Sequence, residues 1–367
     1  MKIIENADLK GKKALIRADF NVPIENGAIS DTNRIDAALP TIELCLENGA
    51  SQVVILAHLG QPVIYPDPKL SLKPVAEYLA KKYEFKLVEK PKFFPEELAG
   101  FQVAEKVILV ENTRFTKKEE ENNPDFAKAM SEFGDVFIFD AFASAHRAHA
   151  STVGIMNYLP SYAGLLVEKE LGYLEPIRET PRRPFVVMVG GAKVSDKLPT
   201  IEFLAEHADY VLVGGVIANT FMRAMGIDVK SSKCERDQIN NARRIIELLG
   251  EKLILPEDYV WDNKQAICDI GPKTVMRFIQ KIGSARAVLW NGNLGKTEDS
   301  RYEAGTLNVA RYLAIQGNLR VVAGGDTVGY LNNQKLAERM TFVSTGGSAT
   351  LEYLAGKELP ALKALGY

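Results

Sequence analysis

Basic side chains follow several apolar segments in the first half of the chain. The segment FDAFASAHRAHAST places His146, Arg147 and His149 among small and apolar neighbours. Arg114 follows the apolar run VILVEN, and His58 follows VVILA. Planar guanidinium groups match both phosphate and carboxylate in geometry. These residues therefore predict a site for a small substrate that carries such groups.

Three further residues extend this basic set. Asp19 and Asn21 end the first apolar run, in RADFNVP, and Arg34 lies near the start of an expected helix, in DTNRIDAALP. Taken singly, an arginine after a strand is usually a surface residue, and a lone histidine is more often a hydrogen-bonded structural group. Several of them at neighbouring strand ends of one sheet instead favour a compact basic pocket.

Glycines follow the apolar segments of the second half. They stand at Gly190-Gly191, Gly214-Gly215, Gly292, Gly324-Gly325 and Gly346-Gly347. Glycine lets the backbone approach a phosphate closely, and the free N–H groups at a helix start favour an anion. One such turn is weak evidence, but five on one sheet edge favour a nucleotide or phosphate site.

Two familiar nucleotide motifs are not complete in this chain. The segment GNLGKT contains Gly-Lys-Thr, but Trp290 stands where a phosphate-binding loop of that type needs its first glycine. No GxGxxG pattern opens a helix after the first strand. A nucleotide site here must follow another design.

The elements that must position these residues alternate between strand and helix patterns. Such alternation predicts mostly parallel sheets covered by helices. Strands are expected at 13–20, 52–58, 85–89, 106–112, 135–142, 185–191, 210–215, 252–262, 286–292, 320–326 and 341–347. Helical patterns include 33–49, 125–134 and 167–179.

A charged, proline-containing break, RETPRRP, follows the helical pattern at 167–179 and predicts a domain boundary. We expect a substrate domain at 1–164, a helical linker and hinge at 165–183, and a nucleotide domain at 184–367. This organisation leaves open that the C-terminal tail packs back on the first domain. A length of 367 residues suits two such domains.

Composition narrows the functional classes. Hydrophobic residues make up 46% and charged residues 25% of the chain, as in globular proteins. A net charge of −2 argues against a general nucleic-acid or membrane surface. The chain contains neither a signal-peptide pattern nor an apolar run long enough to cross a bilayer. We expect a cytoplasmic monomer without nucleic-acid or membrane partners.

Several motifs together resemble the phosphoglycerate kinase family, in order and spacing across essentially the whole chain. They are RADFNVP, DTNRIDAALPTI, HLGQP, ENTRF, DAFASAHRAHASTVG, GGAKVSDK, DIGPKT, WNGNLG, GGDT and STGGSATLEYLAGKELP. The resemblance implies two Rossmann-like α/β domains with mostly parallel sheets, joined by a helical hinge. It also implies reversible transfer of the acyl phosphate of 1,3-bisphosphoglycerate to ADP, giving 3-phosphoglycerate and ATP, with Mg²⁺.

The resemblance also implies residue roles. Phosphoglycerate binding is implied for Asp19, Asn21, Arg34, His58, Arg114 and Arg147. Nucleotide binding is implied for Lys197, Gly214, Gly215, Asn291, Glu298, Asp326, Thr327, Gly346 and Gly347. Arg34 and Lys193 match catalytic residues, and Asp326 matches the residue near the metal. His146 and His149 are expected to contact substrate or to position Arg147.

Phosphoryl transfer explains why such residues are needed. Its transition state spreads charge over phosphoryl oxygens, so positioning and electrostatic stabilisation dominate and no general base is required. Arg34 and Lys193 would supply positive charge from opposite domains. We therefore expect the domains to close over the substrates and exclude water.

Some positions depart from the family pattern. Gln61 replaces a basic residue, Asn293 a proline and Ser348 a glycine. Ile267 and Cys268 stand where glycine and leucine are usual beside the nucleotide base. These departures motivate an alternative, a catalytically weak relative that binds nucleotide or phosphoglycerate as a regulator. A purely structural α/β protein would leave the arginines and lysines unexplained.

Overall fold

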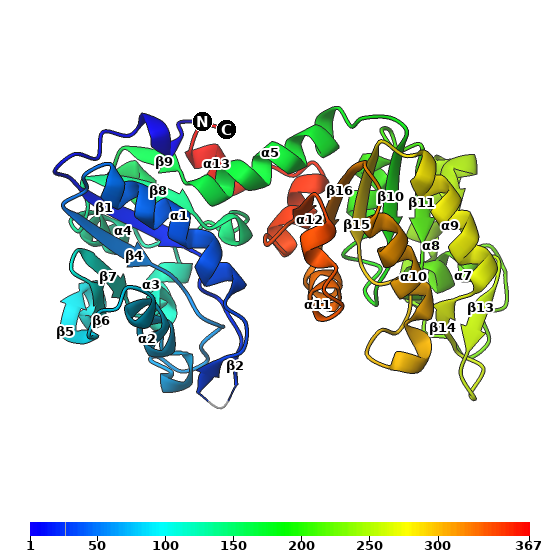
Figure 1. Ribbon diagram of the computed structural model, residues 1–367, viewed down its shortest axis with the longest axis horizontal. Helices are drawn as coiled ribbons and strands as arrows, with labels where there is room; N and C mark the ends of the chain where they lie inside the picture. The colour runs from blue at the N-terminus through cyan, green and yellow to red at the C-terminus, as the bar shows by residue number, and fades with distance from the viewer. Residues whose placement is uncertain (26) are drawn as a thin grey trace. The chain divides into compact units, whose positions relative to one another are not determined.

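The computed structural model describes residues 1–25 and 27–367, which form two compact units (Figure 1). The first unit contains Met1–Leu171 together with Glu358–Tyr367, and the second contains Gly172–Lys357. Helix α5 (Leu165–Glu179) contains the division between them. Among the described helices, none is both long and apolar enough to span a membrane.

The first unit is built on a seven-stranded sheet, in the order β5-β6-β7-β4-β1-β8-β9. Its strands are β1 (Lys13–Ala18), β4 (Gln52–Leu56), β5 (Val88–Phe94), β6 (Leu98–Ala104), β7 (Val107–Val110), β8 (Val136–Asp140) and β9 (Ser161–Ala163). Neighbouring strands in the run β7-β4-β1-β8-β9 pair in parallel, and β5 and β6 add an antiparallel edge. The loops after β7, β4, β1 and β8 therefore leave one edge of the sheet.

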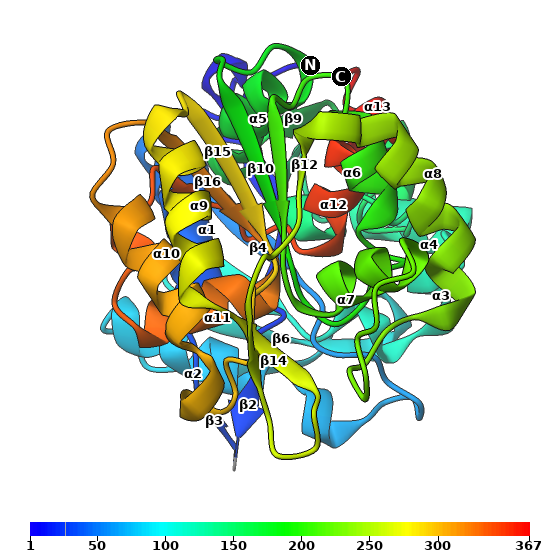
Figure 2. The ribbon, with the colours of Figure 1, turned by 90° about the vertical axis from the view of Figure 1, so that its right-hand side faces the viewer.

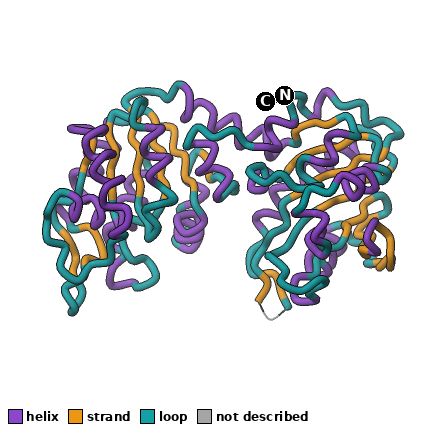
Figure 3. Tube along the Cα trace, turned by 180° about the vertical axis from the view of Figure 1, so that it is seen from behind, coloured by secondary structure: helices purple, strands orange, loops and turns teal. Residues whose placement is uncertain are grey.

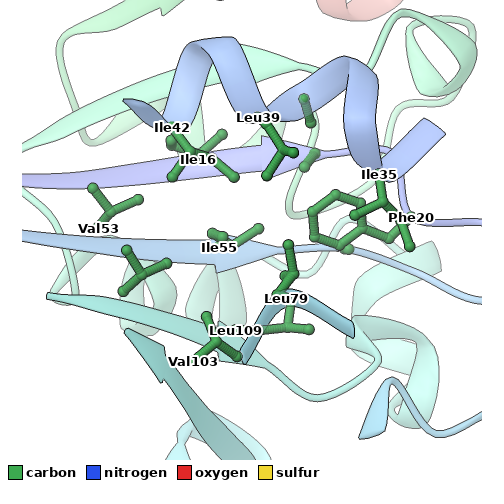
Figure 4. Close-up of a cluster of buried hydrophobic side chains, with 14 of the residues drawn as sticks. Ile16, Phe20, Ile35, Leu39, Ile42, Val53, Ile55, Leu79, Val103 and Leu109 are labelled. Carbon is green, nitrogen blue, oxygen red and sulfur yellow. The ribbon is translucent and has the colours of Figure 1, made fainter. Parts of the chain in front are cut away.

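Helices cover this sheet because their apolar stripes bury against it. Ile35, Leu39 and Ile42 of α1 belong to the same buried cluster as Ile16 and Ile55 of the strands (Figure 4). Their spacing of three and four residues places them on one helix face. The helices lying wholly in this unit are α1 (Asn33–Glu47), α2 (Lys73–Lys82), α3 (Lys117–Glu120), α4 (Pro124–Ser131) and α13 (Pro360–Ala364). A short hairpin joins β2 (Ile24–Glu25) and β3 (Ala28–Ile29).

The second unit contains a six-stranded parallel sheet, in the order β12-β11-β10-β15-β16-β17. Its strands are β10 (Phe185–Val189), β11 (Tyr210–Val213), β12 (Leu253–Ile254), β15 (Ala287–Asn291), β16 (Leu319–Ala323) and β17 (Phe342–Val343). A separate antiparallel pair consists of β13 (Tyr259–Trp261) and β14 (Ile267–Ile270).

Helices lie on both faces of the second sheet (Figures 2 and 3). They are α6 (Leu198–Leu204), α7 (Gly215–Ala224), α8 (Ile239–Leu249), α9 (Pro272–Ser284), α10 (Ala304–Ala314), α11 (Gly325–Asn333) and α12 (Ser348–Leu354). The chain leaves β10 toward β11 and leaves β15 toward β16, on opposite sides of the β10–β15 pair. Such a reversal of strand order opens a crevice at the carboxyl ends of the strands, where open α/β sheets bind ligands.

The predicted fold class is confirmed, with two local corrections. The predicted strand 85–89 begins later, at Val88, and pairs antiparallel with β6, which was not predicted. Pro91 is tolerated there because β5 is an edge strand. The predicted strand 252–262 is interrupted near Pro256 and becomes β12 and β13, which belong to different sheets. Pro256 has no N–H to donate to a strand ladder, and the chain bends just after it, before β13 begins.

Candidate active site

In the first unit, the predicted substrate residues lie at the carboxyl ends of adjacent parallel strands. Asp19 follows β1, His58 follows β4, Arg114 follows β7 and Arg147 follows β8. These strands are neighbours in the order β7-β4-β1-β8, so their carboxyl ends share one edge of the sheet. The structure thus brings together side chains that are more than a hundred residues apart in sequence.

Asp19 fixes the first of the three arginines. Its carboxylate is 2% exposed, and its Oδ2 accepts a hydrogen bond of 2.7 Å from Arg34 Nη1, in the first turn of α1. Its Oδ1 accepts from the backbone N–H of Asn21 at 3.2 Å. Asn21 Oδ1 in turn accepts from the N–H of Gly60 at 2.9 Å, which joins the loops after β1 and β4. Asp19 and Asn21 therefore hold Arg34 and the loop after β4 in place at the predicted substrate site.

Arg114 is buried, and its surroundings hold it in place. Its Nη1 donates to the carbonyl oxygen of Gly60 at 2.7 Å, and its Nε lies 3.2 Å from Glu120 Oε1. Burial lowers the pKa of Arg114 to about 10, and the charge of Arg147 adds to this effect. The guanidinium is thus already desolvated before any ligand arrives.

Sequence reasoning missed Arg17, which is 1% exposed near the carboxyl end of β1. Its Nε donates to Ser151 Oγ at 2.8 Å, and its Nη2 lies 3.0 Å from His58 Nδ1. Arginine only donates, so Nδ1 of His58 must accept and the proton of the neutral ring stays on Nε2. Burial, followed by the charges of Arg17 and Arg114, lowers the pKa of His58 well below its ordinary value. His58 is consequently a neutral hydrogen-bond donor.

Glu119 is a second residue that sequence reasoning missed. Its fully buried carboxylate accepts from the N–H of Ser151 at 2.9 Å and from Ser151 Oγ at 2.5 Å. Burial raises its pKa, while the charge of Arg17 acts in the opposite direction. His149 Nδ1 lies 3.9 Å from Glu119 Oε1. Because burial and nearby arginines lower the pKa of His149 to about 3, this contact joins a neutral ring to the carboxylate.

The loop after β8 presents Arg147 through local contacts. Arg147 Nε donates to His146 Nε2 at 3.2 Å, a geometry that fits the predicted positioning role of His146. The carbonyl oxygen of Arg147 accepts from Thr152 Oγ1 at 2.6 Å. Helix α13 holds the same loop, because the N–H of Ala361 donates to the carbonyl oxygen of Ala145 at 3.1 Å.

The second unit contains a cavity of about 490 Å³ at the carboxyl ends of its strands. Three of the predicted nucleotide residues lie on its wall: Gly215, Glu298 and Asp326. Apolar wall residues come mainly from α7 and from β13, β14 and their surroundings, and they include Met222, Pro256, Tyr259, Ile267 and Ile270. The cavity thus combines a largely apolar side with glycine turns and acidic side chains.

Close approaches between backbone segments explain why glycine stands at positions 190 and 215. The N–H of Gly191 donates to the carbonyl oxygen of Asn293 at 2.8 Å, and the N–H of Gly215 donates to that of Leu294 at 2.9 Å. A Cβ on Gly190 would lie 2.1 Å from the oxygen of Asn293. Gly215 also has a φ of +57°, which disfavours side chains. The loops after β10, β11 and β15 therefore meet through their backbones.

The other predicted nucleotide residues lie outside the cavity wall but near the same strand ends. Lys197 is partly buried, and this burial lowers its pKa to about 8, opposed by the charge of Asp326. Both polar atoms of the Asn291 side chain lack a partner among the described residues. Thr327 Oγ1 accepts from the N–H of Gly292 at 2.8 Å. Lys193 is exposed in the loop after β10. The remaining three are Gly214, Gly346 and Gly347, which follow β11 and β17.

Asp326 is the candidate metal ligand. It is exposed in the first turn of α11 and lies on the cavity wall. Within residues 1–25 and 27–367, no three His, Cys, Asp or Glu side chains are grouped to bind a metal. Mg²⁺ usually keeps several waters and takes one or two protein carboxylates together with substrate phosphates. A lone carboxylate at the edge where phosphate binding is predicted fits that preference.

Comparisons with known proteins agree with this two-unit arrangement. A model of the family described as phosphoglycerate kinase matches residues 4–357. The phosphoglycerate kinase of Chloroflexus aurantiacus is 43% identical, with 99% of this chain and 98% of that protein covered. The chain belongs to the phosphoglycerate kinase family. It is therefore an enzyme, a kinase with phosphoglycerate kinase activity.

Other members of the family extend the comparison. The phosphoglycerate kinase of Maricaulis maris is 42% identical over 99% of this chain and 96% of that protein. The structure of phosphoglycerate kinase from Coxiella burnetii matches with a TM-score of 0.88 and 37% identity, covering 99% of this chain and 98% of that one. The phosphoglycerate kinase structure from Pyrococcus horikoshii matches with a TM-score of 0.85 and 29% identity, covering 100% and 98%.

The positions that depart from the family pattern occupy different environments. Gln61 is exposed, directly after Gly60 of the basic pocket. Ile267, Cys268 and Asn293 lie on the cavity wall. Ser348 is exposed at the start of α12. The departures therefore fall at the predicted ligand-binding edges and leave the buried charged network of the first unit intact.

Proposed function

We propose that the enzyme transfers the acyl phosphate of 1,3-bisphosphoglycerate reversibly to ADP, with phosphoglycerate on the first unit and nucleotide on the second. The observation that carries this division of labour is the buried cluster of arginines around His58 at one edge of the first sheet. Burying a charged group costs folding free energy unless the group is paired with an opposite charge or hydrogen-bonded. A ligand with two anionic groups would provide partners for these arginines.

The phosphoglycerate site consists of donors that are held before the ligand binds. Arg34, Arg114 and Arg147 offer guanidinium groups to phosphate and carboxylate, which they match as forks. His58 offers its Nε2–H, because Nδ1 faces Arg17. Asp19 and Asn21 orient these donors through Arg34 and Gly60.

The nucleotide site combines the cavity with the glycine turns. Its apolar side suits a base, while Glu298 on the wall suits ribose hydroxyls as an acceptor. Lys197 and the N–H groups at the start of α7 favour phosphate. The residues proposed to line the nucleotide side are Gly214, Gly215, Asn291, Thr327, Gly346 and Gly347.

Transfer needs no proton abstraction. In the forward reaction an oxygen of the ADP β-phosphate bonds to the acyl phosphorus, the bond from phosphorus to the carboxyl oxygen breaks, and 3-phosphoglycerate leaves as a carboxylate. Arg34 and Lys193 stabilise the charge on the phosphoryl oxygens. Asp326 would hold Mg²⁺, which supplies charge neutralisation to the nucleotide phosphates when bound.

The proposed reaction also requires movement of the two units. The acyl phosphate must reach the nucleotide, so the two units must approach each other during the reaction, with α5 as the hinge. Solution scattering should then show the most compact particle with both ligands bound, and equal scattering in all ligand states would contradict closure. We also propose a cytoplasmic monomer. The near-neutral net charge of −2 supports the further expectation that it has no nucleic-acid or membrane partners.

A coupled assay of ATP formation from 1,3-bisphosphoglycerate and ADP tests the proposed reaction. Robust turnover that is lost in Lys193→Ala is the expected result. A regulator would instead bind both ligands in calorimetry without turnover, and that outcome would overturn the catalytic proposal. Titrating both 3-phosphoglycerate and ADP into Arg114→Ala and into Glu298→Ala checks the division of labour, because each variant should weaken the binding of one ligand only.

A further inference from the structure

The loop after β15 is the point at which the nucleotide-side loops of the second unit meet. Its carbonyl oxygens at Asn293 and Leu294 accept from the glycine turns after β10 and β11. Its N–H at Lys296 donates to the carbonyl oxygen of Cys268 at 2.7 Å. The same loop continues to Glu298 on the cavity wall. Its conformation therefore affects several sides of the cavity at once.

Asn293 has a side-chain contact inside this loop. The residue is 7% exposed, and its Nδ2 donates to Thr297 Oγ1 at 2.7 Å. Its Oδ1 has no hydrogen-bond partner among the described residues, so the bond to Thr297 is what orients the amide. The family pattern usually has proline at this position, and proline has no amide side chain. A proline at this position could not make this contact.

We propose that the hydrogen bond from Asn293 to Thr297 positions Glu298 for the ribose of the nucleotide. This inference rests on the proposed role of Glu298 in ribose binding. Thr297 directly precedes Glu298, and consecutive Cα atoms are only about 3.8 Å apart. Fixing Thr297 therefore restricts where the Glu298 carboxylate can lie.

The hydrogen bond should increase nucleotide affinity by holding the loop in its bound geometry before the nucleotide arrives. Glu298 is exposed, so a free loop would have to become ordered whenever nucleotide binds. Ordering one side chain and a short loop costs affinity, and a tether that holds the bound geometry in advance reduces that cost. A single neutral hydrogen bond of this kind changes affinity by about 3- to 10-fold. The effect should appear in the affinity for nucleotide.

Paired nucleotides separate positioning from general damage to the fold. The affinities of ADP and of 2′,3′-dideoxy-ADP, which lacks both ribose hydroxyls, would be measured by calorimetry for Asn293→Ala, Thr297→Val and the double variant. Each single variant should bind ADP about 3- to 10-fold more weakly, and the double variant no more weakly than the weaker single one. Dideoxy-ADP affinity should stay nearly constant. Thr297→Ser keeps the hydroxyl and should bind ADP normally.

The controls distinguish this inference from the proposed function. Glu298→Gln should weaken ADP but not dideoxy-ADP. If it weakens neither, the ribose role of Glu298 fails, and the inference fails with it. If Glu298→Gln acts as expected while Asn293→Ala and Thr297→Val bind ADP normally, the inference alone is overturned. Equal losses for both nucleotides would also overturn it, because they indicate a distorted cavity. Thermal unfolding of each variant identifies misfolded protein.

Discussion

The two proposed ligand-binding edges both lie at the carboxyl ends of parallel strands, but different groups form them. At the edge of the first sheet, charged side chains are buried and hydrogen-bonded to other buried polar groups, as in the contacts that Arg17 makes with His58 and Ser151. At the edge of the second sheet, backbone turns form the framework, and Lys193, Glu298 and Asp326 are exposed. One site is a network of side chains, and the other is a scaffold of glycines with charged side chains at its margin.

Because of this difference, mutations at the two sites should have different effects on stability and on activity. Buried charges must satisfy one another, so removing one leaves its partner desolvated and costs folding free energy. Replacing an exposed charged residue changes the folding free energy little, so the main effect is the loss of its contact with ligand. Variants of the first site should therefore affect folding, whereas variants of the charged residues at the second site should affect activity alone.

The largest effect is expected for Glu119→Ala. Its removal leaves Arg17 and Ser151 without their buried anion, which should cost about 3–5 kcal/mol of unfolding free energy. Glu121→Ala, two residues away and exposed, should change stability by less than about 0.5 kcal/mol. Urea denaturation measures both. Similar stabilities for the two variants would contradict the description of the first site as an interdependent network.

Lys193→Ala should show the opposite behaviour. Lys193 is exposed, so its loss should leave the unfolding free energy nearly unchanged. Because its charge is proposed to act on the transferring phosphoryl group, kcat should fall by at least about 10²-fold. Steady-state kinetics beside Lys230→Ala, an exposed lysine with no proposed role, provides the comparison. An unchanged kcat would remove Lys193 from catalysis.

Lys197 adds a pH dependence that the exposed charged residues of the second site should lack. Burial lowers its pKa to about 8, so the free enzyme loses this charge as the pH rises above that value. Bound phosphate favours the charged form and raises the pKa again, so binding takes up a proton. ADP affinity should therefore weaken above about pH 8, by up to about tenfold per pH unit. In Lys197→Arg the charge persists, and calorimetry from pH 7 to 9.5 should show a flatter profile.

The sequence predicted those parts of the sites that depend on local pattern. Asp19, Arg34 and Arg114 stand where strands end or a helix begins, and glycines follow the strands of the second sheet, so parallel pairing alone places them at common edges. Arg17 carried a usable signal, since a charge inside an apolar strand requires a buried partner. The proposed roles of all these residues stay predictions.

Other features depend on contacts that no local pattern contains. Nothing in KKEE distinguishes Glu119 from its acidic neighbours, because its burial depends on Ser151, about thirty residues later. The role of Asn293 depends on the turn that brings Thr297 to its amide. The predicted strand 252–262 was wrong because an apolar run does not reveal that its two parts join different sheets. Such long-range pairing is decided by tertiary packing.

The smallest effect is expected for Gln61→Arg, which tests whether the edge of the first site behaves like its interior. Gln61 is exposed, but it follows Gly60, whose carbonyl oxygen accepts from Arg114 and whose N–H donates to Asn21. An arginine there should reach a bound phosphate while staying in contact with water, so its gain is that of a screened ion pair. Calorimetry should show 3-phosphoglycerate binding tightened by about 3- to 10-fold at low salt and less at high salt, with ADP affinity unchanged as the internal control. Gln61→Lys should give part of the gain, because an ammonium lacks the guanidinium fork. If Gln61→Arg leaves 3-phosphoglycerate affinity the same at both salt concentrations, residue 61 points away from the phosphate, and the buried arginines alone set the affinity of the first site.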